Sequence, residues 1–453
     1  MSATAPPRPR AVLLGVQLSA VADGEFASSL DELARLAKTL GFEVVGRVTQ
    51  RRGRLETGAV VGAGKLKELA EWTGGSGEVP VGPPGKRRSD EERPGDAEPE
   101  PGGERAPAEA ARAGLVLVDH ELTPSQARNL ERATGAEVLD RTAVILAIFQ
   151  RHARSREARL QVEIARLAYI APRLRETGGG RDREGGGIGG RGAGESASEL
   201  DRRKVRDRIA ELRAELAAIE REAGTRRVRR AQANRVALVG YTNAGKSSWM
   251  RALTGSDVRV EDKLFATLGT TVRALAPPGA THVLVSDTVG FIKHLPHDLV
   301  ASFRSTLDEA RESDLLLHIV DASDPAFEAQ MAVTREVLAS IGADEVPRRV
   351  VLNKADRLDA ARRAEIAAAH ADALLLSAKR PEDAAMLRAA LLAFFERDLE
   401  EEELVVPYAL QRVVAEAHAR GHVLDETHDA VGTRLRVRAS RAVLARLRAA
   451  LAG

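Results

Sequence analysis

The sequence predicts a multidomain α/β protein, and three observations support this. Its 453 residues exceed the size of one typical core. Apolar strand-like runs alternate with helix-period segments in both halves of the chain. The stretch between them, Val144–Glu222, is helical in pattern on both sides of a Gly/Arg-rich loop. We expect an N-terminal α/β domain at 1–140 with a helical hairpin at 141–232, a central α/β domain at 233–398, and a small C-terminal α/β domain at 402–453.

Composition narrows the class of protein. Hydrophobic residues make up 43% and charged residues 30% of the chain, as in soluble globular proteins. The absence of cysteine excludes disulfides, thiolate metal sites and cysteine nucleophiles. No apolar run approaches the ~18 residues that span a bilayer. Arg8 and Arg10 precede an apolar stretch that Gln17 interrupts, so we interpret it as a strand rather than a signal peptide and expect a cytoplasmic protein.

The N-terminal domain is expected to alternate strands and helices. A helix is predicted at 29–40, capped by Ser28 or Ser29, and a second helix is capped near Thr123 or Ser125. Apolar, β-rich runs predict strands at 11–18, 42–48 and 114–119.

Two segments of this domain need separate interpretation. Gly62–Lys65 resembles a phosphate loop, but Ala59 and Leu66 stand where that loop needs glycine and a hydroxyl. We therefore predict an ordinary strand-to-helix turn there. Residues 73–110 are rich in Gly, Pro, Glu and Arg without apolar periodicity, which predicts a disordered insert.

Two amphipathic runs flank a Gly/Arg-rich loop at 178–194, which predicts an antiparallel helical hairpin. Residues 151–235 hold 22 Arg or Lys against 13 Asp or Glu, so the loop could contact a polyanion, with RNA the first candidate. A solvated basic face on an interdomain spacer is the alternative. The apolar positions are Leu160, Ile164, Leu167, Val205, Ile209, Leu212, Leu216 and Ile219.

The central domain carries a nucleotide motif. The apolar strand 235–239 runs into Gly240–Ser247, a G-x-x-x-x-G-K-S loop followed by a helix at 248–253. Its backbone N–H groups can wrap phosphates, Lys246 can reach the β- and γ-phosphates, and the Ser247 hydroxyl can bind Mg²⁺. The loop alone leaves ATP and GTP equally open.

Three later motifs select guanine. Asp287–Gly290 is a D-x-x-G in which Asp287 can hold Mg²⁺ through water and Gly290 can donate its N–H to the γ-phosphate. Asn353–Asp356 is an N-K-x-D whose aspartate can accept from guanine N1–H and the 2-amino group, a donor pair that adenine lacks. Ser377–Lys379 can reach guanine O6. Because each follows an apolar strand, we predict a P-loop GTPase domain with a mostly parallel sheet and helices on both faces.

A threonine between the first two motifs should complete the Mg²⁺ shell when γ-phosphate is bound. Spacing leaves Thr267, Thr270 and Thr271 open as that ligand. Phe291 stands where hydrolytic GTPases often carry a water-orienting glutamine, so hydrolysis by the protein alone should be slow.

The C-terminal segment predicts a small docking module. Asp398–Glu403 is an acidic run suited to a linker. A strand, a helix, two strands and a final helix should follow it, at 404–408, 413–418, 423–427, 433–437 and 440–451.

Nearly the whole chain outside 73–110 resembles the HflX family of GTPases, which associate with the large ribosomal subunit. The glycine loop at 185–194 and the second switch at 287–297 carry part of this resemblance. The departures include Gly269, where the family usually has aspartate. The other matching segments are Asp119–Pro124, Leu139–Thr142, Leu160–Glu163, Tyr169 and Pro172–Leu174.

The resemblance implies residue roles. It favours Thr267 as the Mg²⁺ ligand, with Thr271 second, and suggests that Asn243 coordinates K⁺ as in some GTPases. The implied catalytic residues are Lys246, Thr267 and Gly290. The expected GTP contacts are Gly240, Tyr241, Thr242, Asn243, Ala244, Gly245, Lys246, Ser247, Ser248, Phe265, Ala266, Thr267, Leu268, Gly269, Asp287, Thr288, Val289, Gly290, Asn353, Lys354, Ala355, Asp356, Ser377, Ala378 and Lys379.

The resemblance also implies a function. It suggests a monomeric GTPase that binds GTP or GDP with Mg²⁺, engages the large (50S) ribosomal subunit and its rRNA, and splits or rescues stalled ribosomes. DNA is not an expected partner. The alternative is an RNA-binding ribosome-assembly factor that holds GTP as a slowly turned-over ligand.

Overall fold

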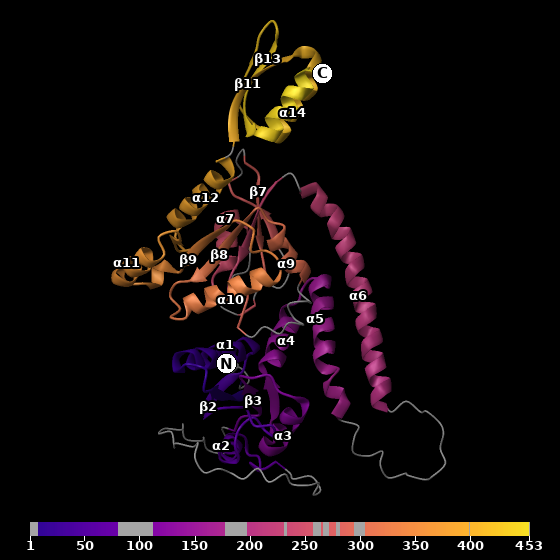
Figure 1. Ribbon diagram of the computed structural model, residues 1–453, viewed down its shortest axis with the longest axis vertical. Coiled ribbons are helices and arrows are strands. Elements are labelled where there is room, and N and C mark those ends of the chain that lie inside the picture. The colour runs from indigo at the N-terminus through magenta and orange to yellow at the C-terminus, as the bar shows by residue number, and fades with distance from the viewer. Residues whose placement is uncertain are drawn as a thin grey trace, which may run out of the picture. The chain divides into compact units, whose positions relative to one another are not determined.

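The chain forms two compact units (Figure 1). The N-terminal unit comprises residues 1–219, 261–269 and 293–304, and the C-terminal unit comprises residues 220–260, 270–292 and 305–453. The computed structural model describes residues 8–79, 112–176, 197–230, 233–256, 264–265, 271–277, 281–293, 304–397 and 399–452.

The N-terminal unit contains a four-stranded parallel sheet of order β2-β1-β3-β4. Parallel neighbours require crossover helices, which accounts for the alternation in the sequence. Helices α1 and α4 pack together on one face, and α2 and α3 pack together on the other (Figure 1). The elements are β1 (Arg10–Leu18), α1 (Asp23–Leu40), β2 (Glu43–Arg52), α2 (Ala63–Thr73), β3 (Leu115–Val118), α3 (Pro124–Thr134), β4 (Glu137–Asp140) and α4 (Arg141–His152).

The first helix departs from the sequence prediction. It begins at Asp23, well before Ser29, and its N-cap residue Ala22 makes no side-chain cap. Asp23 and Glu25 place negative charge in the first turn, where the helix dipole favours it. The cap predicted near Thr123 is confirmed, because Thr123 forms a reciprocal capping box at the start of α3.

The insert predicted at 73–110 is wrong at its first residues. Thr73 ends α2, and the N–H of Gly77 donates to the carbonyl of Ala133 at 2.9 Å, which fixes this segment to the domain. The remainder of that prediction, 80–110, lies outside the described residues.

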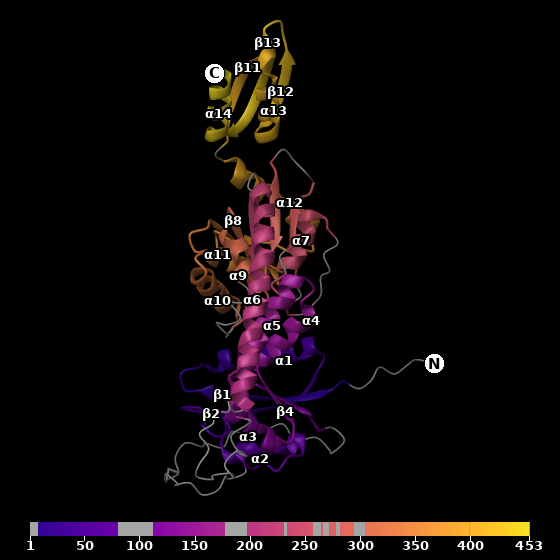
Figure 2. The ribbon, with the colours of Figure 1, turned by 90° about the vertical axis from the view of Figure 1, so that its right-hand side faces the viewer.

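Two long helices follow α4 in the chain. Helices α5 (Arg156–Ile170) and α6 (Ala197–Arg230) run side by side (Figures 1 and 2). Arg156 pairs with Glu215 across them. The loop at 178–194 lies outside the described residues. The apolar positions that meet between the helices are Leu160, Ile164, Leu167, Ile209, Leu212, Leu216 and Ile219.

The C-terminal unit contains a six-stranded sheet of order β10-β9-β8-β5-β7-β6, parallel except for β6. Helices α7 and α12 cover one face and α10 and α11 the other, which confirms the predicted architecture. Trp249 on α7 is fully buried in this core. The elements are β5 (Asn234–Val239), α7 (Lys246–Thr254), β6 (Thr271–Ala274), β7 (Val283–Asp287), α9 (Arg304–Arg311), β8 (Leu315–Asp321), α10 (Phe327–Ser340), β9 (Arg348–Asn353), α11 (Ala360–Ala369), β10 (Leu374–Leu375) and α12 (Pro381–Glu396).

The last module is a three-stranded antiparallel sheet with two helices (Figure 2). The acidic run predicted as a linker is wrong, and the module begins at Leu399 rather than 402. Glu401 and Glu403 lie in the first strand, where they pair with Arg438 and Arg434 on the neighbouring strand. The elements are β11 (Leu399–Pro407), α13 (Gln411–Arg420), β12 (His422–His428), β13 (Gly432–Ser440) and α14 (Arg441–Ala452).

Among the helices that the structure describes, none is long and apolar enough to cross a membrane.

Candidate nucleotide-binding site

Four of the sequence motifs meet at one edge of the six-stranded sheet. They follow β5, β7, β9 and β10, which are parallel, so their carboxyl ends share that edge. In open α/β sheets this edge is where ligands bind. The motifs are Gly240–Ser247, Asp287–Gly290, Asn353–Asp356 and Ser377–Lys379.

The loop after β5 needs its glycines. Gly240 and Gly245 have φ angles of 143° and 101°. A Cβ on Gly240 would lie 2.1 Å from the carbonyl oxygen of Ile319, and one on Gly245 would lie 2.2 Å from the Asn353 amide nitrogen. Because α7 begins directly at Lys246, the loop presents helix N-terminal N–H groups to a bound anion.

Lys246 is buried at the start of α7. Its Nζ donates to the carbonyls of Gly240 at 2.9 Å and Tyr241 at 2.8 Å. Burial lowers the pKa of this amine to about 8, and the nearby Asp287 carboxylate opposes that shift. The amine is therefore held inside the loop, where phosphate oxygens can replace the two carbonyls.

This pKa predicts a pH dependence. Bound phosphate favours the charged amine, so above pH 8 the free protein must take up a proton to bind nucleotide. GDP affinity should be full below pH 8 and fall above it, by up to about tenfold per pH unit. A labelled-GDP titration from pH 6.5 to 9 measures this, with exposed Lys67→Arg as the control that should keep the wild-type profile. A flat wild-type profile would contradict the assignment.

Ser247 and Asp287 fit a magnesium site. The Ser247 hydroxyl donates to the Asp287 carboxylate at 2.8 Å, which brings together two oxygen ligands of the kind that Mg²⁺ prefers. Asp287 itself is almost fully buried at the end of β7. Ala266, Thr267, Leu268, Gly269 and Thr270 lie outside the described residues, whereas Thr271 begins β6 opposite Asp287.

Phe265, expected near GTP, packs within the N-terminal unit. It lies edge-on to Phe149, with ring centroids 4.6 Å apart, and its carbonyl accepts from His152 Nδ1 at 2.7 Å. Its φ of 57° is unusual for a residue other than glycine. Only 2% of Phe265 is exposed, so the described part of the first switch is anchored by N-terminal residues.

Two residues of the N-K-x-D segment have different roles: Asn353 connects loops of the site, and Asp356 faces the base. The Asn353 amide donates to the carbonyl of Ala244 at 2.7 Å and accepts from the N–H of Ala378 at 3.1 Å. Asn353 therefore joins the phosphate loop to the last motif. Asp356 accepts from the Ser377 hydroxyl at 2.6 Å, and Lys379 lies 3.3 Å away.

The carboxylate of Asp356 is prepared for base recognition. The hydrogen bond from Ser377 lowers its pKa first, and Lys379 adds to that effect, so Asp356 is ionised at neutral pH. An ionised carboxylate can accept two hydrogen bonds from a guanine edge.

Two supporting residues were missed by the sequence reasoning. Asp321 pairs with Lys354 at 2.6 Å, and Asp383 accepts from the N–H of Ser377 at 2.8 Å. Asp321 ends the apolar strand β8, and that position was the available signal. Asp383 lies in the first turn of α12 and carried no such signal.

Phe291 is a core residue. It is 1% exposed, its N–H donates to the Gly240 carbonyl at 3.1 Å, and its carbonyl accepts from the N–H of Thr242 at 2.7 Å. A Cβ on the preceding Gly290 would lie 2.9 Å from Lys246 Nζ. Phe291 therefore fixes the phosphate loop against the D-x-x-G segment and cannot orient a water.

His318, beside the phosphate loop, predicts a stabilising substitution. It lies on β8 opposite Val239 and is fully buried, and neither ring nitrogen has a hydrogen-bond partner among the described residues. His318→Leu should raise the free energy of unfolding by about 1 kcal/mol, because unmet polar groups leave the core.

The same residue predicts an acid sensitivity. Burial, and then Arg348, Arg335 and Lys246, lower the pKa of His318 to about 3. Between pH 6.5 and 3 only the unfolded chain is protonated there, so stability falls as pH falls. Urea unfolding should show a smaller acid loss in His318→Leu. Exposed His282→Leu is the control, and equal acid loss in both variants would refute the prediction.

Family models match three parts of the chain. The GTP-binding GTPase N-terminal model matches residues 27–78 and 105–150, and the GTP-binding GTPase middle-region model matches 152–230. The model described as 50S ribosome-binding GTPase matches 235–354.

Individual relatives match over greater lengths. The protein named GTPase HflX from Gluconacetobacter diazotrophicus is 58% identical over 450 residues, 99% of each chain. Its namesake from Caldanaerobacter subterraneus is 39% identical over 97% of this chain and 93% of that protein. A solved GTP-binding protein from Sulfolobus solfataricus in complex with GDP aligns with 84% of this chain and 99% of its own, at 22% identity and a TM-score of 0.43.

Proposed function

This chain belongs to the HflX family of GTPases, and from that premise we propose that it acts on the large ribosomal subunit to split or rescue stalled ribosomes. It is a GTPase with GTP and GDP as ligands. One observation carries the proposal: four guanine-nucleotide motifs converge on one sheet edge, and the first two lie within residues 235–354, which match the 50S ribosome-binding GTPase model.

The proposed site divides the nucleotide among its motifs. Backbone N–H groups of Gly240–Ser247 hold the phosphates, with Lys246 at the β- and γ-positions and Gly290 donating its N–H to the γ-phosphate. Asp356 reads guanine N1–H and the 2-amino group, and the N–H groups of Ser377–Lys379 face O6. Asn353 connects the phosphate-binding loop to the base-binding motif through its two hydrogen bonds.

Ser247, Asp287 through water, and Thr267 would hold magnesium, with Thr271 as second choice for the last position. Bound Mg²⁺ supplies positive charge that offsets the phosphate oxygens. The hydroxyl–carboxylate contact of 2.8 Å between Ser247 and Asp287 supports this assignment.

Hydrolysis needs a group that the described site does not supply. Because the Phe291 side chain is buried in the core, the attacking water must be oriented from elsewhere. We propose that the ribosome supplies that group, through the 50S subunit and its rRNA, to a monomeric protein.

Potassium is a second source of activation. Asn243 is exposed in the phosphate loop with a left-handed φ of 60°, a position from which its side chain could share a cation with the phosphates. Replacing K⁺ with Na⁺ should lower the GTP turnover number by about tenfold, and Asn243→Ala should remove that difference. Equal rates in both salts would refute this role, and Asn129→Ala, at a half-buried asparagine of α3, serves as a control.

The central experiment measures GTP turnover with and without purified 50S subunits, together with light scattering of 70S ribosomes. We expect 50S to stimulate turnover and the GTP-bound form to split 70S particles. Stimulation without splitting would favour the ribosome-assembly role, with RNA binding as the main activity. Absence of both effects would refute the ribosomal proposal.

A further inference from the structure

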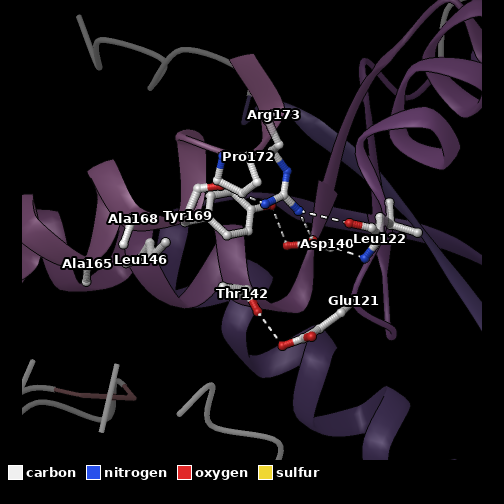
Figure 3. Close-up of a pocket in the computed structure, with 10 residues that line it drawn as sticks. All are labelled: Glu121, Leu122, Asp140, Thr142, Leu146, Ala165, Ala168, Tyr169, Pro172 and Arg173. Atoms are coloured by element: carbon white, nitrogen blue, oxygen red, sulfur yellow. Dashed lines mark hydrogen bonds and ion pairs between the residues drawn. The ribbon is translucent and has the colours of Figure 1, made fainter. Parts of the chain in front are cut away.

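The N-terminal unit contains a pocket separate from the nucleotide motifs (Figure 3). Its volume is about 200 Å³, many times the roughly 15 Å³ that one water needs. It lies at the carboxyl end of β4. The loop after β3 and the first turns of α4 line one side, and the end of α5 lines the other. Several segments that carry the family resemblance meet here, although they are far apart in the chain.

Asp140 fixes the walls of this pocket. Its carboxylate accepts from the Tyr169 hydroxyl and Arg173, both at 2.8 Å, and from the N–H groups of Ala143 at 2.8 Å and Leu122 at 3.2 Å. Four donors occupy the two oxygens, so Asp140 has no acceptor position left for a ligand. Its role is therefore to join the two sides of the pocket.

Arg173 is similarly engaged in the wall. Besides Asp140, it donates to the carbonyls of Tyr169 at 2.9 Å and Leu122 at 3.0 Å. Its guanidinium carbon lies 3.4 Å from the centroid of the Tyr169 ring, so the two groups stack (Figure 3). Burial, and then Asp140, raise the pKa of Tyr169, which keeps its hydroxyl protonated as a donor. A planar cation on an aromatic ring is a surface on which flat rings stack.

Glu121 is the group left to meet a ligand. It is exposed, and its one hydrogen bond among the described residues is a 3.3 Å contact from the Thr142 hydroxyl (Figure 3). Leu146 and Ala168 form an apolar wall of the pocket. The pocket is lined by two carboxylates, Glu121 and Asp140, and one guanidinium, Arg173. Its net charge is therefore negative, which disfavours binding of a phosphate group.

We propose that this pocket binds one unstacked base of single-stranded RNA, and that the base is one with an exocyclic amino group. The ring would lie between the Tyr169–Arg173 stack and the apolar wall, and the amino group would donate to Glu121. Uracil lacks that amino group, so it should bind least well. The phosphates on either side of the base stay outside the negative pocket, which favours a base within a chain over a free nucleotide. This inference rests on the proposed ribosomal role and adds one contact with an RNA base. It can be tested without ribosomes and without measuring GTP hydrolysis.

The test is fluorescence anisotropy with labelled RNA decamers of A, C or U and the full-length protein saturated with GDP, at one fixed salt concentration. We expect the A and C decamers to bind about tenfold more tightly than the U decamer, the effect of one hydrogen bond to a charged group. Glu121→Gln should remove most of that preference, because an amide accepts from an amino group and donates to a carbonyl alike. Exposed Glu131→Gln on α3 is the matched control and should keep it.

A second variant tests the cavity itself. Ala168→Leu fills the space without touching the polar contacts and should weaken binding of all three decamers. Equal binding of A, C and U by the wild-type protein, or unchanged binding by Ala168→Leu, would overturn the proposal. If Ala168→Leu fails to fold, Glu121→Gln still decides, since Glu121 is exposed. AMP and CMP are titrated in parallel, and affinities equal to those of the decamers would overturn the assignment to RNA.

Discussion

Asp356→Asn is expected to lower GTP affinity on the order of 10³-fold and to raise affinity for xanthosine triphosphate. The reason is donor–acceptor matching. The carboxylate of Asp356 accepts from both guanine donors, whereas an amide presents one donor and one acceptor. Guanine would then bring its 2-amino group against an N–H, while xanthine has a carbonyl at that position and would accept from it.

The measurement is competition of unlabelled GTP and xanthosine triphosphate against labelled nucleotide. Asp372→Asn, an exposed aspartate between α11 and β10, is the matched control and should bind as the wild type does. If Asp356→Asn retains the preference for GTP, the guanine edge is read by another residue and the assignment of this site is wrong.

Arg141→Met is expected to destabilise the N-terminal unit by about 3–5 kcal/mol. Arg141 is 2% exposed at the start of α4 and pairs with Glu32 on α1 and with Asp119 after β3, the latter at 2.7 Å. It also donates to the Ser29 hydroxyl at 3.2 Å. Removing the guanidinium would leave two carboxylates buried together without a cation, which costs far more than losing an exposed pair.

This effect has a predicted pH signature. Burial already raises the pKa of Asp119, and loss of the cation would raise it further. The destabilisation should be greatest at neutral pH and shrink as pH falls, because protonation removes the unpaired charge. A loss that is constant from pH 7 to 5 would show that packing, rather than charge, dominates.

The chain offers its own reporter for this measurement. Of its two tryptophans, Trp72 lies in the N-terminal unit and Trp249 lies in the C-terminal unit, and both are buried. In a Trp249→Phe background, fluorescence during urea unfolding reports the N-terminal unit alone. Arg47→Met is the control, because Arg47 pairs with Asp31 at the surface and should contribute less than about 1 kcal/mol.

The same cluster occupies the point of the N-terminal sheet where the strand order reverses. Its strand order reverses between β1 and β3, and ligands of open parallel sheets bind at the carboxyl ends of such strands. Here Asp119 directly follows β3, and Arg141 and Glu32 complete an ion-pair cluster with it. At Gly62–Lys65 the sequence predicts an ordinary turn rather than a phosphate loop, because a glycine and a hydroxyl are missing.

The sequence predicted those parts of the fold that depend on local residue patterns. The strands that lead into Gly240, Asp287 and Asn353 were predictable because apolar periodicity and motif spacing are short-range properties of the sequence. The connection made by Asn353 could not be predicted, since its partners Ala244 and Ala378 are backbone groups brought near only by folding.

Predictions from charged segments were wrong where the partner residues lie far away in the sequence. The run Glu400–Glu403 has the composition of a linker but forms part of β11, where it faces arginines more than thirty residues later in the chain. Residues Glu121, Asp140 and Arg173 likewise gave no sign of a shared pocket, because they come from three separate segments.

The anchoring of Phe265 limits how this protein can be divided or recombined. A fragment spanning 233–398 would carry the Phe265 ring without Phe149 and His152, which bury it and bond its carbonyl. A fragment ending at 219 would lose the ring that covers Phe149. Chimeras that exchange one part between relatives should therefore need compatible residues at 149, 152 and 265 together, although a motif boundary separates these positions.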